Sequence, residues 1–307
     1  MAEVAGVYHL GGMTLVSEIA LPELPLLQDP SPGLHPVNIR LGSVPNHLPD
    51  AVEVDPDCFA TPSQYFLRIP GIARYLVNRG AEVVIEPDAN ALLLDVRAYL
   101  LGSLFAVLCQ QRGLLPLHAS AVSHRGKVVA FAGNSGQGKS SLAAHLAQRG
   151  FTVVSDDICL IDPTHANQAI VIPTAPWLKL WRNSLEKLGR HTEGLERVFS
   201  EDEKYRVPLE DTRAPEPIHT LMFLEGDAAS SAPSLQIEAV SAVEAVPLMM
   251  NLIHQAYLLE ATGQLQQSFL RCSRVSSQAR AYRLIRPWGL SHLEATVDAL
   301  QKFLLES

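Results

Sequence analysis

The feature that most constrains this sequence is a strand, a glycine-rich loop and a helix in direct succession between Val128 and Gly150. The apolar run VVAFA that opens the segment has the composition of a short buried strand. The next eight residues, GNSGQGKS at 133–140, match G-x-x-x-x-G-K-[ST] at every fixed position. Leu142 and Leu146 follow at helical spacing, and Gly150 suits the helix end. The segment therefore predicts a phosphate-binding loop, rather than a coincidental turn before a helix.

Each residue type in this loop suits the binding of phosphate. Glycines let backbone N–H groups converge on phosphate oxygens, and the start of the next helix adds the positive end of its dipole. Lys139 would bring its charge to the β- and γ-phosphates, and the Ser140 hydroxyl would hold the Mg²⁺ that bridges them. The residues expected to contact a nucleotide are Gly133, Asn134, Ser135, Gly136, Gln137, Gly138, Lys139, Ser140 and Ser141.

Composition describes a folded protein that does not bind nucleic acid in general. Of its 307 residues, 47% are apolar and 18% are charged, and the net charge is −8. No basic tract appears, so we expect no nucleic-acid partner. The four cysteines are too far apart to indicate a disulfide framework or a zinc site, which favours reduced core thiols in a cytoplasmic protein. The most apolar tract, 98–109, is too short to span a membrane, so we expect no membrane anchor.

The N-terminal part of the chain reads as a small β-rich region over residues 1–90. Short β-prone runs alternate there with Pro, Gly, Asn and Asp clusters. The expected strands are 6–10, 13–18, 37–42, 64–69, 73–77 and 82–86. A helix that is apolar on nearly every side is expected from Ala89 to Arg112, and a helix of this kind should be buried between two regions.

Acidic and histidine side chains flank the glycine-rich loop. The segment 114–122 predicts a strand beside the loop strand, which places His118 near the phosphates. The strand 151–155 ends in Asp156 and Asp157. In a protein with such a loop, one carboxylate could hold the metal and the other could accept a proton from an attacking hydroxyl. The alternatives are a core histidine and a solvated turn.

The C-terminal half carries weaker signals. The charged segment 201–209 is expected to be an exposed stretch, from which Lys204 or Arg206 could stabilise charge on a transferred phosphate; an ordinary charged loop is the alternative. The apolar segment 245–270 is expected to be helical, and 291–305 to form a C-terminal helix capped by Ser291.

These motifs resemble the catalytic core of the HPr kinase/phosphorylase family. The resemblance rests on His118, on the loop at 133–140 and on the sequence SDD at 155–157, in that order and spacing. It implies an α/β (α+β) protein, in which residues 91–307 form a P-loop kinase core of the HPr kinase and phosphoenolpyruvate carboxykinase type behind the β-rich region. It also implies ATP and Mg²⁺ as cofactors and a serine hydroxyl of a protein as the acceptor.

The same resemblance implies a role for each matching residue. Lys139 would contact the terminal phosphates and Ser140 the Mg²⁺, while the loop glycines cradle the phosphates. Asp156 would be the general base, His118 would polarise the acceptor hydroxyl, and Asp157 would assist at the metal, although the order within the Asp pair stays open. Asn134 stands where HPr kinases usually carry an acidic residue, and their C-terminal signature segment is not recognisable.

Segments outside the core resemble HPr-kinase-related proteins that accompany peptide-modifying enzymes. They are GGMTLVSEIALPEL at 11–24, ARYLVNRGAEVVIEP at 73–87 and LLPLHASAV at 114–122. Some of those proteins are similar to lasso-peptide precursor kinases, which phosphorylate a C-terminal serine. The leading hypothesis is therefore an ATP-dependent serine kinase acting on a peptide or small protein. A nucleotide-binding regulatory protein and a kinase of free serine are the alternatives, and the oligomeric state stays open.

Overall fold

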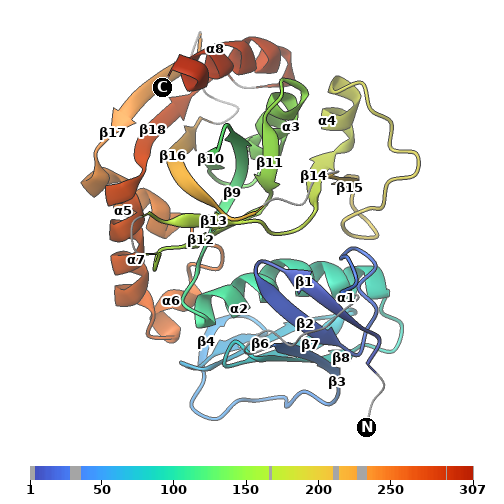
Figure 1. Cartoon of the computed structure of the whole chain (residues 1–307). Coiled ribbons are helices and arrows are strands. Elements are labelled where there is room, and N and C mark those ends of the chain that lie inside the picture. The colour runs from blue at the N-terminus through green and yellow to red at the C-terminus, as the bar shows by residue number, and fades with distance from the viewer. Residues whose placement is uncertain are drawn as a thin grey trace.

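The chain forms two lobes, each built on a large sheet, with one long helix lying between them (Figure 1). The computed structural model describes residues 4–27, 36–165, 168–209, 214–226, 234–287 and 289–306. The N-terminus lies at the far end of one lobe and the C-terminus at the far end of the other. The architecture is therefore mixed α/β with two large sheets.

The N-terminal lobe is an eight-stranded sheet in the order β1, β2, β3, β8, β7, β6, β5, β4. In β2 and β7, buried residues alternate with partly exposed ones, as expected when one face of a sheet is covered. The bounds are β1 Gly6–Leu10, β2 Met13–Ser17, β3 Val37–Leu41, β4 Val52–Asp55, β5 Cys58–Ala60, β6 Gln64–Ile69, β7 Ala73–Asn78 and β8 Glu82–Pro87. The strands expected from the sequence are confirmed; β4 and β5 were not expected, because they are very short.

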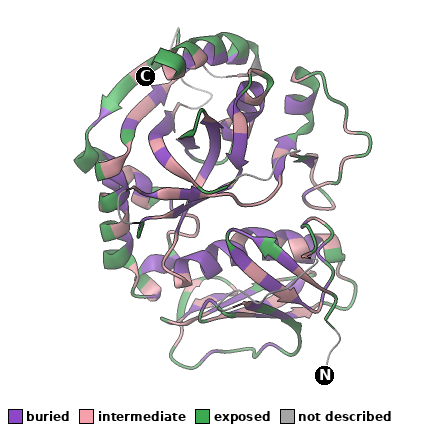
Figure 2. Cartoon of the chain, viewed as in Figure 1, coloured by how far each residue is buried: buried purple, intermediate pink, exposed green. Residues whose placement is uncertain are grey.

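The long helix covers this sheet and also faces the second lobe. It consists of α1 (Leu93–Tyr99), the π-helical turn η1 (Leu100–Leu104) and α2 (Phe105–Gln111). It is apolar and long enough to cross a membrane, but 72% of its most apolar window is buried within the protein, so it is a core helix (Figure 2). The expectation of a buried helix is confirmed. The helix is longer than the apolar tract suggested, and it starts at Leu93 rather than Ala89, because a turn from Asp88 to Ala91 precedes it.

The C-terminal lobe holds the second eight-stranded sheet, which runs in the order β10, β9, β12, β13, β16, β18, β17, with β11 also paired to β9. Because β10 pairs with β16 as well, part of this sheet closes on itself. The bounds are β9 Leu115–His124, β10 Lys127–Ala132, β11 Thr152–Ser155, β12 Ile158–Asp162, β13 Ile170–Ile172, β16 Glu216–Glu225, β17 Gln236–Val240 and β18 Arg280–Ile285.

Helices cover the two faces of this sheet, and a small two-stranded arm projects beside it (Figure 1). One face packs in a core with α5 and α7, and the other packs with α3, α8 and the arm. The arm is formed by β14, β15 and α4. The bounds are α3 Lys139–Gln148, β14 Trp177–Trp181, α4 Arg182–Lys187, β15 Lys204–Pro208, α5 Ala242–Asn251, α6 Leu258–Ala261, α7 Leu265–Gln278, η2 Leu290–His292 and α8 Leu293–Glu306.

Two expectations for the C-terminal half were wrong, and a third was right only in part. The segment 201–209 is not an exposed stretch: it contains β15, whose Tyr205 and Val207 enter the core beside α3. The segment 245–270 is not one helix but parts of three, and Gly263 with φ +67° marks the second break. Ser291 lies within the short turn η2 and does not cap α8.

Two leucines of the long helix should differ strongly in how much they contribute to the free energy of unfolding. Leu104 is fully buried in the N-terminal core, whereas Leu93 is 53% exposed. Leu104→Ala should lower the free energy of unfolding by about 2 to 5 kcal/mol, because it removes buried methyl groups and leaves a cavity. The matched change Leu93→Ala should cost no more than about 0.5 kcal/mol. Urea titration measures both, and equal losses would contradict this burial.

Candidate active site

The strands that pair with β9 bring the glycine-rich loop and the Asp pair next to His118, which lies on β9 itself. On one edge, β10 pairs with β9 as far as Ala132, so that the Gly133 N–H donates to the His118 carbonyl at 3.3 Å. On the other edge, β11 and β12 pair with β9 one after the other, and Ile158 lies opposite His118. Residues more than twenty positions apart in the chain therefore meet at one place.

Asp156 and Asp157 interrupt the strand formed by β11 and β12. The Ile158 N–H donates to the Asp156 carbonyl at 2.8 Å, and Asp157 has φ +67°. These features describe a tight turn centred on Asp157, a strained conformation for a residue with a Cβ. The turn sends the two neighbouring carboxylates to different places.

The Asp157 carboxylate points into a cavity of about 440 Å³ in front of the loop. Its Oδ1 lies 3.5 Å from His118 Nε2, and its Oδ2 accepts from Lys179 Nζ at 2.7 Å. Burial raises the pKa of Asp157, but the Lys179 ammonium and the His118 hydrogen bond outweigh it and hold the pKa well below its ordinary value. Asp157 is therefore a charged carboxylate at neutral pH.

The Asp156 carboxylate, in contrast, does not line this cavity. It is 4% exposed, its Oδ1 accepts from the Ser120 hydroxyl at 2.5 Å, and its Oδ2 accepts from the Lys179 backbone N–H at 2.7 Å. Both oxygens are thus used to fasten β9 and β14 to the turn. The assignment of Asp156 as the general base has no support from this position, and Asp157 is the carboxylate beside His118.

The loop itself has the backbone that its glycines permit. Gly136 and Gly138 have φ +83° and +79°, a region that side chains with a Cβ rarely enter. Helix α3 begins directly after Gly138, and Ser140 lies in its first turn facing the cavity. The Gln137 side chain accepts from the Asn134 N–H at 2.6 Å and braces the loop from within.

Lys139 is the buried cation of the loop. Only 6% of it is exposed, and its Nζ donates to the carbonyls of Gly133 and Asn134 at 2.8 Å each. Burial lowers its pKa to about 8, although the charges of Asp157 and Asp156 oppose that shift. A phosphate in the cavity would add negative charge and restore the ordinary pKa.

Three further cations line the cavity. Lys179 comes from β14, Lys204 from β15 and Arg286 from the end of β18. Arg286 donates to the Gln137 carbonyl at 2.8 Å, so its guanidinium lies against the loop, and burial lowers its pKa. With Lys139 they give the lining four cations, and Asp157 is the one acidic residue among the described residues that line it.

The predicted site residues other than Asp156 fall into three groups. Those that line the cavity are His118, Ser135, Gly136, Gly138, Lys139, Ser140, Ser141, Asp157 and Lys204. Gly133, Asn134 and Gln137 shape the loop from behind. Arg206 lies elsewhere: it is 6% exposed and its guanidinium is 3.6 Å from Glu23 and 3.5 Å from Glu196. It does not line the cavity, and its partners give it a structural role.

Sequence reasoning missed Lys179, Arg286 and His254. Lys179 alternates with apolar residues in WLKLW, a signal that could have placed it on one face of a strand. Arg286 comes directly after β18, and no sequence motif around it indicates a role in phosphate binding. His254 packs edge-to-face on His118 with ring centroids 5.7 Å apart, and burial lowers its pKa to about 4, so it is a neutral support for His118.

Comparison with known proteins gives a partial match. A family model for ScmC, a SynChlorMet cassette protein, matches residues 84–194. This range holds the loop, His118 and the Asp pair. No curated protein matches the chain. Among solved structures, the Hpr(Ser) kinase/phosphatase from Coxiella burnetii is similar over 62% of this chain and 91% of that one, at 13% identity and a TM-score of 0.33. That likeness is a distant, partial resemblance of fold.

The lowered pKa of Lys139 predicts a pH-dependent stability. Between about 8 in the folded protein and 10.5, its ordinary value, the unfolded chain binds a proton that the folded chain does not. Stability should therefore rise with pH in this window. Relative to Lys139→Met, the wild-type free energy of unfolding should increase by up to roughly 3 kcal/mol from pH 8 to pH 10.5. Urea titrations across the window measure this, and a constant difference between the two proteins would refute it.

Proposed function

We propose that the chain is an ATP- and Mg²⁺-dependent kinase that transfers the γ-phosphoryl group to a serine hydroxyl of a peptide or small protein. The observation that carries the proposal is the position of Asp157 and His118 in the same cavity as the glycine-rich loop. A protein that only senses a nucleotide needs the loop but not a carboxylate and an imidazole facing it. The four cysteines are free and buried, which fits a reducing cytoplasm, where we place the reaction.

The cavity fits a nucleoside triphosphate in size and charge. Its volume of about 440 Å³ lies in the range of ligand sites, and its lining combines cations with the start of α3. The lining also includes the apolar side chains of Leu180, Trp181 and Leu293. We assign the phosphates to the part of the cavity beside the loop, with Lys139 and Arg286 next to them.

The residues present also fit Mg²⁺ when it arrives with phosphate. Among the described residues, no cluster of three His, Cys, Asp or Glu side chains could hold a metal unaided. Mg²⁺ usually takes one or two protein oxygens together with phosphate oxygens and water. Ser140 would supply the protein oxygen, and the charge of Asp157 would lie near the metal. Bound MgATP supplies the phosphoryl group and offsets the negative charge that transfer develops.

Asp157 is the group that we assign to the acceptor proton. Its carboxylate is charged, and His118, which lies 3.5 Å away, would orient an acceptor hydroxyl. A carboxylate with a low pKa is a weak base. Phosphoryl transfer, however, passes through a loose transition state, so its rate depends more on the position of the base than on its strength. Lys179, which holds Asp157 at 2.7 Å, fixes that position. Asp156 supports the turn from behind.

The Asp pair predicts unequal effects of one chemical change. Asp157→Asn should lower phosphoryl transfer by roughly 100-fold or more, because a general base is worth about that much, while nucleotide binding persists. Asp156→Asn can still accept one of its two hydrogen bonds and should keep transfer within about tenfold. Lys139→Ala should weaken both binding and transfer. Radiolabelled ATP and nucleotide titration separate these effects. A larger loss in Asp156→Asn than in Asp157→Asn would return the base role to Asp156.

The acceptor can be identified with a matched set of substrates. We propose the C-terminal serine of a precursor peptide, the lasso-peptide type of substrate, as the acceptor. A peptide that ends in serine should be labelled by γ-labelled ATP, whereas the same peptide ending in alanine should not. Labelling of free serine at an equal kcat/KM would instead identify a small-molecule kinase. A nucleotide that binds while nothing is labelled would identify a regulatory protein.

A further inference from the structure

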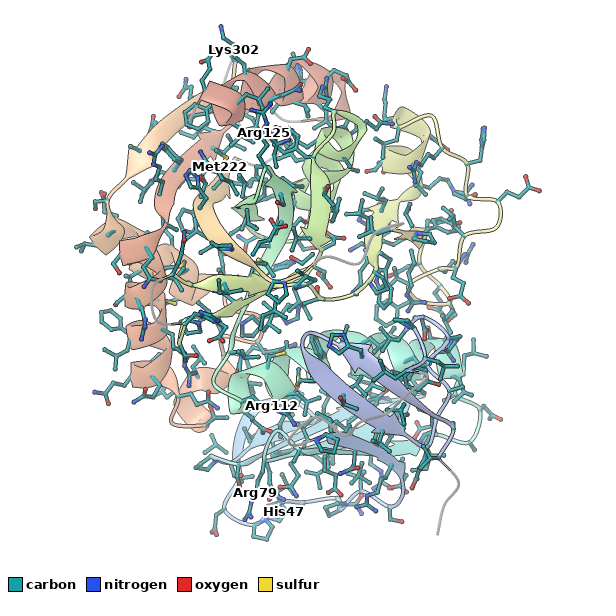
Figure 3. All side chains as sticks on the ribbon, viewed as in Figure 1. His47, Arg79, Arg112, Arg125, Met222 and Lys302 are labelled. Atoms are coloured by element: carbon teal, nitrogen blue, oxygen red, sulfur yellow. The ribbon has the colours of Figure 1, made fainter. Side chains whose placement is uncertain are left out.

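A second cavity lies away from the nucleotide cavity, where α2 ends and β9 begins. It is a groove of about 500 Å³, bounded by the ends of α2 and β12 and by α7. Arg112, labelled in Figure 3, lies at its α2 end and donates from Nε to the Gly80 carbonyl at 2.5 Å. The nucleotide cavity lies beside α3, whereas this groove lies beside α7, which packs on the other face of the sheet.

One side of helix α7, distinct from its buried side, lines this groove. Gln267, Leu270, Arg271 and Arg274 line it, and their spacing of three, one and three residues places them on one side of a helix. The buried side of α7 is different and carries Ser268, Cys272, Val275 and Ser276. The groove face is therefore not part of the core stripe of the helix. Leu270 on it is 52% exposed.

Positive charge is concentrated in this groove although the whole chain has a net charge of −8. Among the described residues, no carboxylate forms an ion pair with Arg271, and burial lowers the pKa of its guanidinium. Arg274 donates to the His165 carbonyl at 3.2 Å. The acidic residue of the lining, Asp162, uses its Oδ1 to accept from the N–H and hydroxyl of Thr164. A half-buried guanidinium without a carboxylate favours an anion from another molecule.

We infer that this groove binds an acidic, partly apolar peptide segment of a partner, through carboxylates on Arg271 and Arg274 and an apolar side chain on Leu270. An arginine guanidinium can form two parallel hydrogen bonds to one carboxylate, a bidentate geometry that suits Asp or Glu side chains. The apolar part of the lining, with Leu114, Pro163 and Leu270, suits a side chain between them. Nucleic acid fits less well, because the described residues that line the groove include no aromatic ring for base stacking and the chain as a whole has a net charge of −8.

The groove can be tested on the full chain without any assay of phosphoryl transfer. The probe is a fluorescein-labelled peptide of alternating Asp and Leu, compared with one of alternating Asn and Leu, by fluorescence anisotropy. We expect the acidic peptide to bind at least about tenfold more tightly, because each charge-assisted pair contributes on that scale. Arg271→Gln with Arg274→Gln should remove that preference, while Arg271→Lys with Arg274→Lys should keep part of it.

Arg68→Gln is the matched control, because Arg68 is an exposed arginine on β6 in the other lobe. It should leave peptide binding unchanged. Thermal unfolding and nucleotide binding of each variant show whether the fold is intact. Equal binding of the two peptides, no binding of the acidic one up to millimolar concentration, or binding that survives the double Gln change would overturn the inference. So would an oligonucleotide of equal charge that binds more tightly and is lost in the same variant.

Discussion

The pairing of β9 with two different partners on its two edges is the constraint on which the candidate site depends. One edge carries β10 and the glycine-rich loop, and the other carries β11 and β12 with the Asp turn between them. In a sheet, alternate residues face the same side, so His118 and Ser120 both point to the side of the loop. His118 then meets Asp157, and Ser120 meets Asp156. A shift of β9 by one residue would turn both side chains to the α5 and α7 side.

A single backbone angle decides which carboxylate reaches the cavity. In an ordinary strand, Asp156 and Asp157 would point to opposite faces of the sheet. The turn with φ +67° at Asp157 breaks that alternation. The Asp157 carboxylate enters the cavity, whereas the Asp156 carboxylate binds Ser120 and the backbone of Lys179. Lys179 bridges the two positions, because its backbone N–H binds Asp156 and its ammonium binds Asp157. The pair thus divides into a structural carboxylate, Asp156, and a carboxylate that lines the cavity, Asp157.

The sequence was most informative where the chemistry lies in one short segment. The loop at 133–140, its strand and its helix could be predicted, because the fixed residues and their order require that local geometry. His118 and the Asp pair could be placed near it, because their strands are its neighbours in the chain. Arg286 could not be found, since it reaches the loop only through the pairing of β16 with β18. The different positions of the Asp156 and Asp157 carboxylates depend on the positive φ of Asp157, and residue propensities do not predict that angle.

The arm that forms one wall of the cavity is held by the N-terminal lobe and its helix. Its β14 and β15 supply Lys179 and Lys204 to the cavity, and β15 also carries the buried Arg206. Arg206 and Arg97 both face Glu23, whose side chain is only 1% exposed. A buried charge left without its partner costs several kcal/mol, roughly 3 to 5, so this cluster strongly favours one placement of the arm. Asp95 on α1 accepts two more hydrogen bonds, from the backbone N–H and the hydroxyl of Ser200, which precedes β15. The cavity wall therefore depends on residues of the β-rich region, which gives that region a direct part in shaping the site.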